Sequence, residues 1–152
     1  MTENNQVFTL ASCQKCHAVN KVKPDLMKDN KGVCGQCGSE LKFHQLVSEV
    51  DLIGLQALIQ KSHMMPVVVD FWAPWCGPCM MFAPTYERAS LTLQGKVAFV
   101  KINTQNFPEA SEVFGIRGIP TLAIFKNGKE VTRQSGAFPY DLLIKWLNEF
   151  AV

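Results

Sequence analysis

A hydrophobic run that leads into two cysteines decides the fold of this chain: residues 67–79 read VVVDFWAPWCGPC. Residues 67–71 are mostly β-branched, which is typical of a buried strand. The segment 79–93 is predicted to be helical, so Cys76 and Cys79 stand where a strand gives way to a helix N-terminus. Free backbone N–H groups and the positive end of the helix dipole stabilise a thiolate there, and the thiolate is the nucleophilic form of cysteine.

The two cysteines of this pair have different expected roles. Cys76 is the expected attacking residue, and Cys79, one helical turn on, is close enough to attack a mixed disulfide and release the product. Pro78 lacks an N–H group, but first-turn N–H groups have no helical partner, so a proline is tolerated at this place. The alternative, one half of a zinc site, needs another cysteine pair nearby, and none remains beside the four N-terminal cysteines.

Strands and helices are predicted to alternate through residues 45–152. Pro108 and Gly115 flank a short helix, and Asn127-Gly128 is a hairpin turn signal. The order βαβαβαββα implies an α/β fold, in which helices cover both faces of a central mixed β-sheet. The helices are expected at 51–62, 79–93 with a kink at Pro84, 108–114 and 140–150, and the strands near 44–48 and at 67–71, 96–103, 121–125 and 130–133.

Composition and charge exclude several classes of protein. With 47% hydrophobic and 18% charged residues among 152, the chain is expected to be a folded globular protein and not a disordered one. A net charge of +2 recruits neither nucleic acid nor an anionic membrane by charge alone. The densest apolar stretch, 64–69, is far shorter than the roughly 20 residues of a membrane helix. Met1–Gln6 carry no basic residue, so no export signal is expected and a cytoplasmic location is predicted.

Four further cysteines lie in residues 1–44, which we predict to be a separate small domain. Cys13 and Cys16 form one Cys-x-x-Cys pair, Cys34 and Cys37 another, and 17 residues separate the pairs. This spacing is typical of a four-cysteine zinc site, in which thiolates at about 2.3 Å close a tetrahedron that leaves no place for water. One structural zinc ion is therefore expected, because a segment of roughly 40 residues rarely folds without metal, disulfides or a partner.

Other readings of these cysteines stay open from the residues alone. The same four cysteines could form two structural disulfides, although the expected cytoplasmic location argues against them. Cys16-His17 also completes the Cys-x-x-Cys-His motif of c-type haem attachment, which the second pair lacks. His17 or His44 could replace one cysteine ligand, but four thiols suffice without them, and exposed side chains beside the site are expected.

The chain resembles the thioredoxin family. The resemblance rests on FWAPWCGPC at 71–79, GIRGIPT at 115–121 and FKNG at 125–128, and it covers roughly 45–152. It implies a thioredoxin fold preceded by a small N-terminal zinc-binding domain, and the four-cysteine prefix resembles the bacterial zinc-containing branch, the thioredoxin 2 type. Met80 departs from the family, because many members carry Lys or Arg after the second cysteine; this puts partner preference in doubt but not the chemistry.

The resemblance also implies roles for residues around the dithiol. Asp70 would accept a proton from Cys79 when the resolving thiol attacks; its other reading is a strand residue at the sheet edge that meets solvent. Lys101 would tune that carboxylate, or it would sit on a polar strand face. Pro120 matches the family's cis-proline opposite the dithiol. The residues expected to bind substrate proteins are Trp75, Gly77, Pro78, Ile119, Pro120 and Gly136.

These features predict an enzyme that reduces protein disulfides. The resemblance implies that thioredoxin reductase recharges the dithiol with electrons from NADPH, and that the chain acts as a monomer. The sequence has no Gly-rich dinucleotide fingerprint after a strand, so NADPH should bind the reductase and not this chain. Two other hypotheses are a redox-responsive binding module, in which the zinc segment docks a partner, and an exported dithiol oxidase or isomerase.

Overall fold

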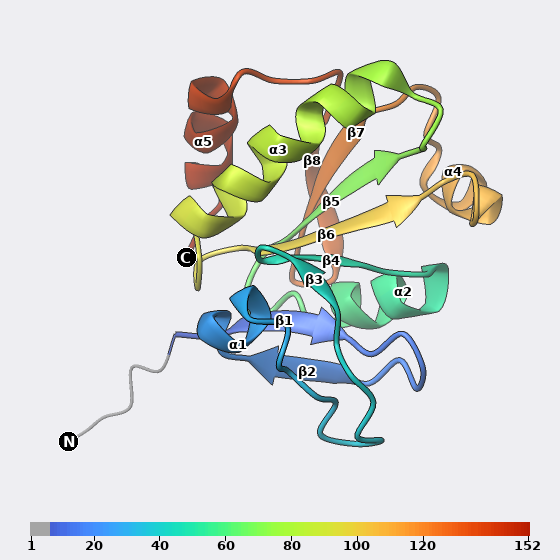
Figure 1. The fold of residues 1–152 in the computed structure, drawn as a ribbon. Coiled ribbons are helices and arrows are strands. Elements are labelled where there is room, and N and C mark those ends of the chain that lie inside the picture. The colour runs from blue at the N-terminus through green and yellow to red at the C-terminus, as the bar shows by residue number, and fades with distance from the viewer. Residues whose placement is uncertain (1–6) are drawn as a thin grey trace.

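A six-stranded mixed sheet forms the centre of the computed structural model, which describes residues 7–152 (Figure 1). The strand order is β3-β4-β6-β5-β7-β8, in which β4, β6 and β5 run parallel and the other neighbours pair antiparallel. The prediction that Met1–Gln6 form no export signal concerns residues outside the described range. The strands are β3 (Phe43–His44), β4 (Val47–Glu49), β5 (Val67–Trp72), β6 (Ala98–Asn103), β7 (Thr121–Lys126) and β8 (Lys129–Ser135).

Helices cover both faces of this sheet, which confirms the predicted fold class. In Figure 1, α3 and α5 lie on one face and α2 lies on the other. Ala110 of α4 shares a buried cluster with Leu55 and Leu58 of α2, so α4 packs on the same side as α2. The helices are α2 (Leu52–Gln60), α3 (Gly77–Thr92), α4 (Pro108–Phe114) and α5 (Tyr140–Asn148). No helix of the described residues is both long and apolar enough to cross a membrane.

Strand β5 supplies both halves of the core because its side chains alternate between the two faces. Val67 and Phe71 pack with α2 and α4, whereas Val68 packs with Phe82 and Tyr86 of α3. Asp70 comes two residues after Val68, so its side chain lies on the same face of the sheet, which is the face covered by α3 and not by α2. The strand therefore places one carboxylate under the helix that begins at the dithiol.

Local signals set the ends of several elements. Helix α4 begins at Pro108 and ends at Phe114, and the capping residue Gly115 adopts the left-handed conformation with φ 63°. Asn127 and Gly128 both have positive φ, 54° and 81°, as a two-residue hairpin turn between β7 and β8 requires. Helix α3 begins two residues earlier than predicted, at Gly77, because Cys76 caps it, and it continues through Pro84.

The N-terminal segment has structure that the sequence pattern did not predict. Strands β1 (Thr9–Ser12) and β2 (Val19–Val22) pair antiparallel, and the short helix α1 (Pro24–Lys28) follows them. Leu10 of β1 joins the buried cluster of α2 and β5, so this segment packs on the sheet domain. Two short strands, β3 and β4, replace the one expected near 44–48. The domain boundary after residue 44 stays a prediction. Strand β3 precedes this boundary and pairs with β4, which follows it.

Candidate functional site: a dithiol and a four-cysteine cluster

Cys76 and Cys79 form a disulfide at the start of α3. Cys76 is the N-cap residue, with an extended backbone, and its Sγ accepts a hydrogen bond from the N–H of Cys79 at 3.2 Å. The N–H of Met80 donates to the carbonyl oxygen of Cys76 at 3.1 Å. Because the helix N-terminus directs N–H groups at Cys76, a thiolate on this sulfur is stabilised once the disulfide opens.

The loop before β7 lies against the same sulfur. The carbonyl oxygen of Ile119 lies 3.7 Å from Sγ of Cys76, and the Ile119–Pro120 peptide bond is cis. The N–H of Gly136 donates to the carbonyl oxygen of Pro120 at 2.8 Å, which joins the end of β8 to this loop. The structure thus brings Ile119, Pro120 and Gly136 together beside the dithiol, whereas their predicted role in substrate binding stays a prediction.

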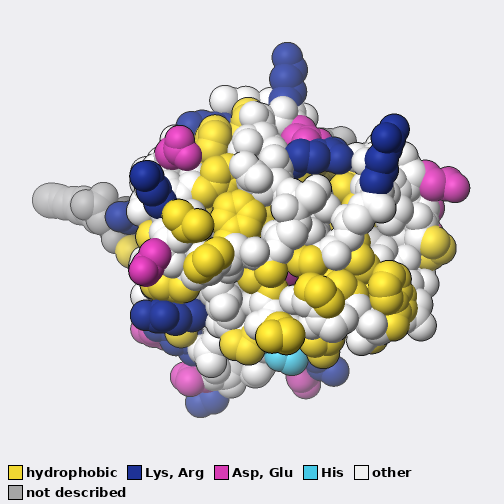
Figure 2. All heavy atoms as spheres, turned by 90° about the horizontal axis from the view of Figure 1, so that it is seen from above, with side chains coloured by type: hydrophobic (Ala, Val, Ile, Leu, Met, Phe, Trp, Pro, Cys, Tyr) yellow, Lys and Arg dark blue, Asp and Glu magenta, His cyan; other side chains and the backbone are white. Residues whose placement is uncertain are grey.

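The surface around the dithiol is apolar and accessible. Trp75 is 72% exposed, Gly77 and Pro78 are exposed, and Met81, which sequence reasoning missed, is 82% exposed. Figure 2 views the molecule from the side of α3 and α5 and shows several hydrophobic groups on that face. A groove of about 300 Å³ begins at Trp75 and is lined by Thr104, Ser111, Ile116, Arg117, Gly118 and Ile119.

Asp70 is buried at the centre of the sheet, which rules out the alternative reading as an edge residue. Its strand lies between β6 and β7, its side chain is only 2% exposed, and its Oδ1 has no hydrogen-bond partner among the described residues. Burial raises the pKa of this carboxyl to about 7, and the positive charge of Lys101 opposes the rise. A carboxyl with a pKa near neutrality can both take up and release a proton.

Lys101 is the register partner of Asp70 on the neighbouring strand β6. Its ammonium lies 4.5 Å from the centroid of the Trp72 ring, and the indole nitrogen of Trp72 is buried without a partner among residues 7–152. The hydroxyl of Tyr86 donates to the carbonyl oxygens of Val68 at 3.0 Å and Val100 at 2.8 Å, which ties α3 to the sheet beside Asp70. Trp72 therefore lies against the ammonium of Lys101, and Tyr86 fixes α3 to the strands that carry Asp70 and Lys101.

The four N-terminal cysteines sit on two similar turns. The N–H of His17 donates to the carbonyl oxygen of Cys13 at 2.8 Å, and the N–H of Gly38 donates to that of Cys34 at 2.9 Å. His17 and Gly38 both have positive φ, 65° and 78°. Each turn also directs backbone N–H groups at a sulfur: Lys15 at Cys13, and Gln36 at Cys34, both at 3.4 Å. Such N–H groups stabilise thiolates: hydrogen bonds from the backbone N–H groups of Cys37 and Gln36 lower the pKa of Cys34 to about 6.

The sulfur atoms of the two turns meet in one cluster. All four Sγ atoms lie within 4.8 Å of one another, with Cys13 3.6 Å from Cys37 and Cys16 3.6 Å from Cys34. In a tetrahedron with zinc–sulfur bonds of about 2.3 Å, neighbouring sulfurs are roughly 3.8 Å apart, so the cluster has the dimensions of a zinc site. The four cysteines could therefore hold one metal ion, and all four are free thiols.

Neither histidine joins this cluster. Nε2 of His17 lies 2.6 Å from Oδ2 of Asp51, the residue that caps α2, and His44 is exposed. The metal-binding group found in the described residues consists of the four cysteines alone. The expectation that four thiols suffice thus agrees with the geometry, but sequence reasoning missed the contact of His17, because its partner is 34 residues away.

Comparison with known proteins assigns the family. The family model described as Thioredoxin matches residues 46–149. A thioredoxin of Synechocystis sp. is 49% identical over 86 residues, which are 57% of this chain and 80% of that protein. Thioredoxin 1 of Nostoc sp. is 47% identical over 85 residues (56% and 79%), and the thioredoxin of Haemophilus influenzae is 44% identical over 85 residues (56% and 79%). The chain belongs to the thioredoxin family and is a protein-disulfide oxidoreductase.

Proposed function

We propose that the chain reduces protein disulfides through the dithiol of Cys76 and Cys79. The thiolate of Cys76 attacks one sulfur of the substrate disulfide; a mixed disulfide forms and the other substrate sulfur leaves as a thiolate that takes up a proton. Cys79 then attacks Sγ of Cys76 and the second substrate thiol is released. The substrate gains two electrons and two protons, and this chain keeps the Cys76–Cys79 disulfide. The observation that supports this proposal is the position of Cys76, which caps the N-terminus of α3 and lies beside the carbonyl oxygen of Ile119.

The buried carboxylate of Asp70 is the proposed proton acceptor for the second step. Cys79 must lose its proton to attack, and it lies on the buried side of α3 together with Phe82 and Tyr86. Asp70 faces the same side from β5, and its pKa of about 7 suits an acceptor at neutral pH. Lys101, its register partner, is the proposed positioning residue, because its positive charge stabilises the ionised carboxylate.

Substrate proteins are proposed to bind around the dithiol. The surface for them consists of Trp75, Gly77 and Pro78 on one side and Ile119, Pro120 and Gly136 on the other. The electrons for the next cycle would come from NADPH through thioredoxin reductase, with NADPH bound to the reductase. A reducing dithiol and a cluster of four free thiols suit a reducing compartment, so we place the protein in the cytoplasm.

We further propose that Cys13, Cys16, Cys34 and Cys37 hold one structural zinc ion, as in the thioredoxin 2 type. The support is the size of the sulfur cluster and the backbone N–H groups directed at Cys13 and Cys34. When bound, zinc would contribute folding energy to a segment whose own apolar cluster is small. These cysteines would then act as ligands and take no part in disulfide exchange.

The test is reduction of insulin by the full chain in the presence of a bacterial thioredoxin reductase and NADPH. The expected result is NADPH oxidation that depends on this chain and is abolished in Cys76→Ser. Val131→Ser, a change of an exposed side chain on the edge strand β8, is the control and should retain the activity. If the wild-type chain were reduced by dithiothreitol but could not pass electrons to insulin, the proposed reductase function would be wrong.

A further inference from the structure

Three charged side chains stand in one row across the parallel part of the sheet. Lys101 of β6 is the register partner of Glu49 on β4 and of Asp70 on β5. Register partners on neighbouring strands point to the same face of the sheet, so all three side chains leave the sheet on the face that α3 covers. We call these three residues the charge row: it places one cation between two carboxylates, and the proposed mechanism uses only Asp70 and Lys101.

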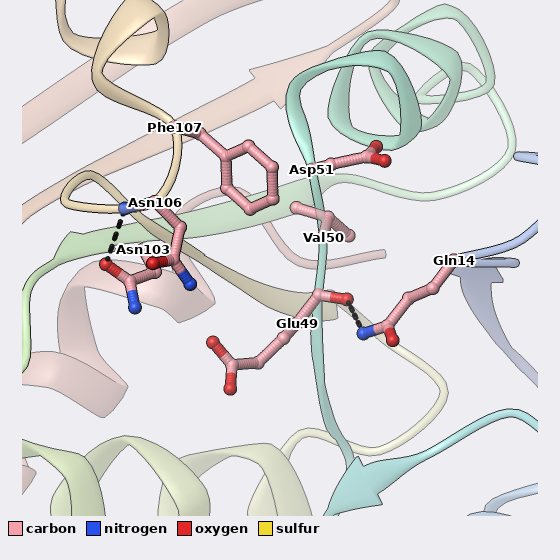
Figure 3. Close-up of a pocket in the computed structure, with 7 residues that line it drawn as sticks. All are labelled: Gln14, Glu49, Val50, Asp51, Asn103, Asn106 and Phe107. Atoms are coloured by element: carbon pink, nitrogen blue, oxygen red, sulfur yellow. Dashed lines mark hydrogen bonds between the residues drawn. The ribbon is translucent and has the colours of Figure 1, made fainter.

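Backbone hydrogen bonds hold Glu49 beside Lys101. The N–H of Val50 donates to the carbonyl oxygen of Lys101 at 3.0 Å, and the side-chain nitrogen of Gln14 donates to the carbonyl oxygen of Glu49 at 2.9 Å. The side chain of Glu49 is half-buried and lines a polar cavity of about 330 Å³, on the same side as the amide of Asn103 (Figure 3). Because water reaches a half-buried carboxylate, Glu49 carries a negative charge at neutral pH.

The ammonium of Lys101 is not committed to either carboxylate. Within residues 7–152 it forms no ion pair with Glu49 or Asp70. It lies 4.5 Å from the centroid of the Trp72 ring, and Oδ1 of Asp70 has no hydrogen-bond partner in that part of the chain. The lysine side chain is long and flexible, so the two carboxylates compete for its charge. The electrostatic field at Asp70 therefore depends on whether Glu49 is charged.

The other neighbours of Asp70 carry no charge at neutral pH. Helix α3 contributes Cys79 and the hydroxyl of Tyr86, and burial raises the pKa of Tyr86 well above its usual range. The register partner of Asp70 on β7 is Leu122. The buried side chains of α5 on this face are apolar: Leu143, Trp146 and Leu147. Among these neighbours, Lys101 is thus the charge that acts on Asp70.

We propose that Glu49 is a positioning residue, which offsets the charge of Lys101 and thereby sets the pH at which Asp70 gains and loses its proton. Without Glu49, the ammonium would be free to pair with Asp70, whose Oδ1 lacks a partner. An opposite charge within about 4–6 Å lowers the pKa of a carboxyl by about 1–3 units, because it stabilises the ionised form. The inference rests on the proposed function, in which Asp70 accepts the proton of Cys79.

The test is titration of the Asp70 carboxyl in the oxidised full chain, followed by NMR of isotope-labelled aspartate and assigned with Asp70→Asn. We expect the midpoint in Glu49→Gln to lie about one pH unit below that of the wild type. Glu49→Asp keeps the charge and should titrate close to the wild type. Glu112→Gln, which removes an exposed carboxylate on α4, is the matched control and should leave the midpoint unchanged.

A second background tests whether Glu49 acts through Lys101. The direct action of Glu49 on Asp70 is weak, because two strand spacings, about 10 Å, separate these residues and water screens Glu49. In Lys101→Met, the change Glu49→Gln should therefore move the midpoint by at most about 0.3 pH units. Equal shifts in both backgrounds would refute the role of Lys101, and an unchanged midpoint in Glu49→Gln alone would overturn the inference.

Kinetics separate this inference from the proposed function. Single-turnover reduction of a peptide disulfide by the reduced chain is measured between about pH 5 and pH 9, and the midpoint of the resolution step should fall in Glu49→Gln together with that of the carboxyl. If the carboxyl shifted and the resolution step did not, the charge row would stand and Asp70 would not be the proton acceptor. If the carboxyl did not shift and the peptide were still reduced, the charge row would be refuted and the reductase function would stand.

Discussion

Replacing Asp70 by asparagine should make the oxidised protein more stable at neutral and alkaline pH. Asparagine has nearly the same shape, but it carries no charge to bury. The folded protein raises the pKa of Asp70 from its ordinary value of 3.8 to about 7, a difference of about 3 pKa units. At about 1.4 kcal/mol per unit, ionising the buried carboxyl costs the folded state about 4 kcal/mol at most.

The pH dependence of this effect has a defined sign. Between about pH 4 and pH 7 the folded state holds a proton that the unfolded state has already lost, so wild-type stability falls as the pH rises through this window and is constant above it. Asp70→Asn removes that fall. The two proteins should therefore differ least near pH 4 and most above pH 7, where the variant is more stable.

The assay is denaturant unfolding of both oxidised proteins across this pH range. A difference in unfolding free energy that grows by several kcal/mol from acid to alkaline pH is the expected result. Thr104→Val, a change of a half-buried polar group that does not ionise, serves as a control and should give a difference independent of pH. Parallel pH profiles for the wild type and Asp70→Asn would refute the reasoning that burial controls this carboxyl.

Three further predictions concern the mechanism, the metal and the core. Asp70→Asn should slow the resolution step by roughly 10² or more, with less effect on the first attack, and unchanged resolution kinetics between about pH 6 and pH 9 would remove Asp70 from the mechanism. Metal analysis with thiol counting should give one zinc per chain and two free thiols at Cys76 and Cys79 after reduction; zinc that survives Cys13→Ser with Cys16→Ser but is lost without Cys76 and Cys79 would reverse the assignment. Tyr86→Phe should reduce the free energy of unfolding by about 1–3 kcal/mol, because it removes the hydroxyl that donates to two buried carbonyl oxygens. Equal stability of the variant and the wild type would contradict the claim that these hydrogen bonds stabilise the fold.

Local signals explain what the sequence predicted well. Pro108 and Gly115 enclose α4, and Asn127-Gly128 forces the turn between β7 and β8, because few other residues adopt these backbone conformations at low cost. The position of Cys76 at the start of α3 followed from the same kind of signal. The predicted elements from residue 51 onward accordingly agree with the structure to within a few residues at their ends.

What could not be predicted depends on partners far apart in the chain. Strands β1 and β2 have four residues each and lie beside cysteine turns, too short for a clear periodic pattern. Whether Asp70 stood at an edge or in the centre depended on the strand order, which is a tertiary property. The hydrogen bond from the side chain of Gln14 to the carbonyl oxygen of Glu49 joins residues 35 positions apart, so only the folded structure brings them together.

The most direct test of the central claim is to trap the mixed disulfide and map its bond. Cys79→Ser should attack a substrate disulfide through Cys76 and then stop, because a serine hydroxyl is too weak a nucleophile to resolve the adduct. Mass spectrometry of adducts formed in cell extract should place the new bond on Cys76, and Cys76→Ser should form few adducts. Abundant adducts of Cys76→Ser through Cys79, with few on Cys79→Ser, would contradict the assignment of Cys76 as the nucleophile.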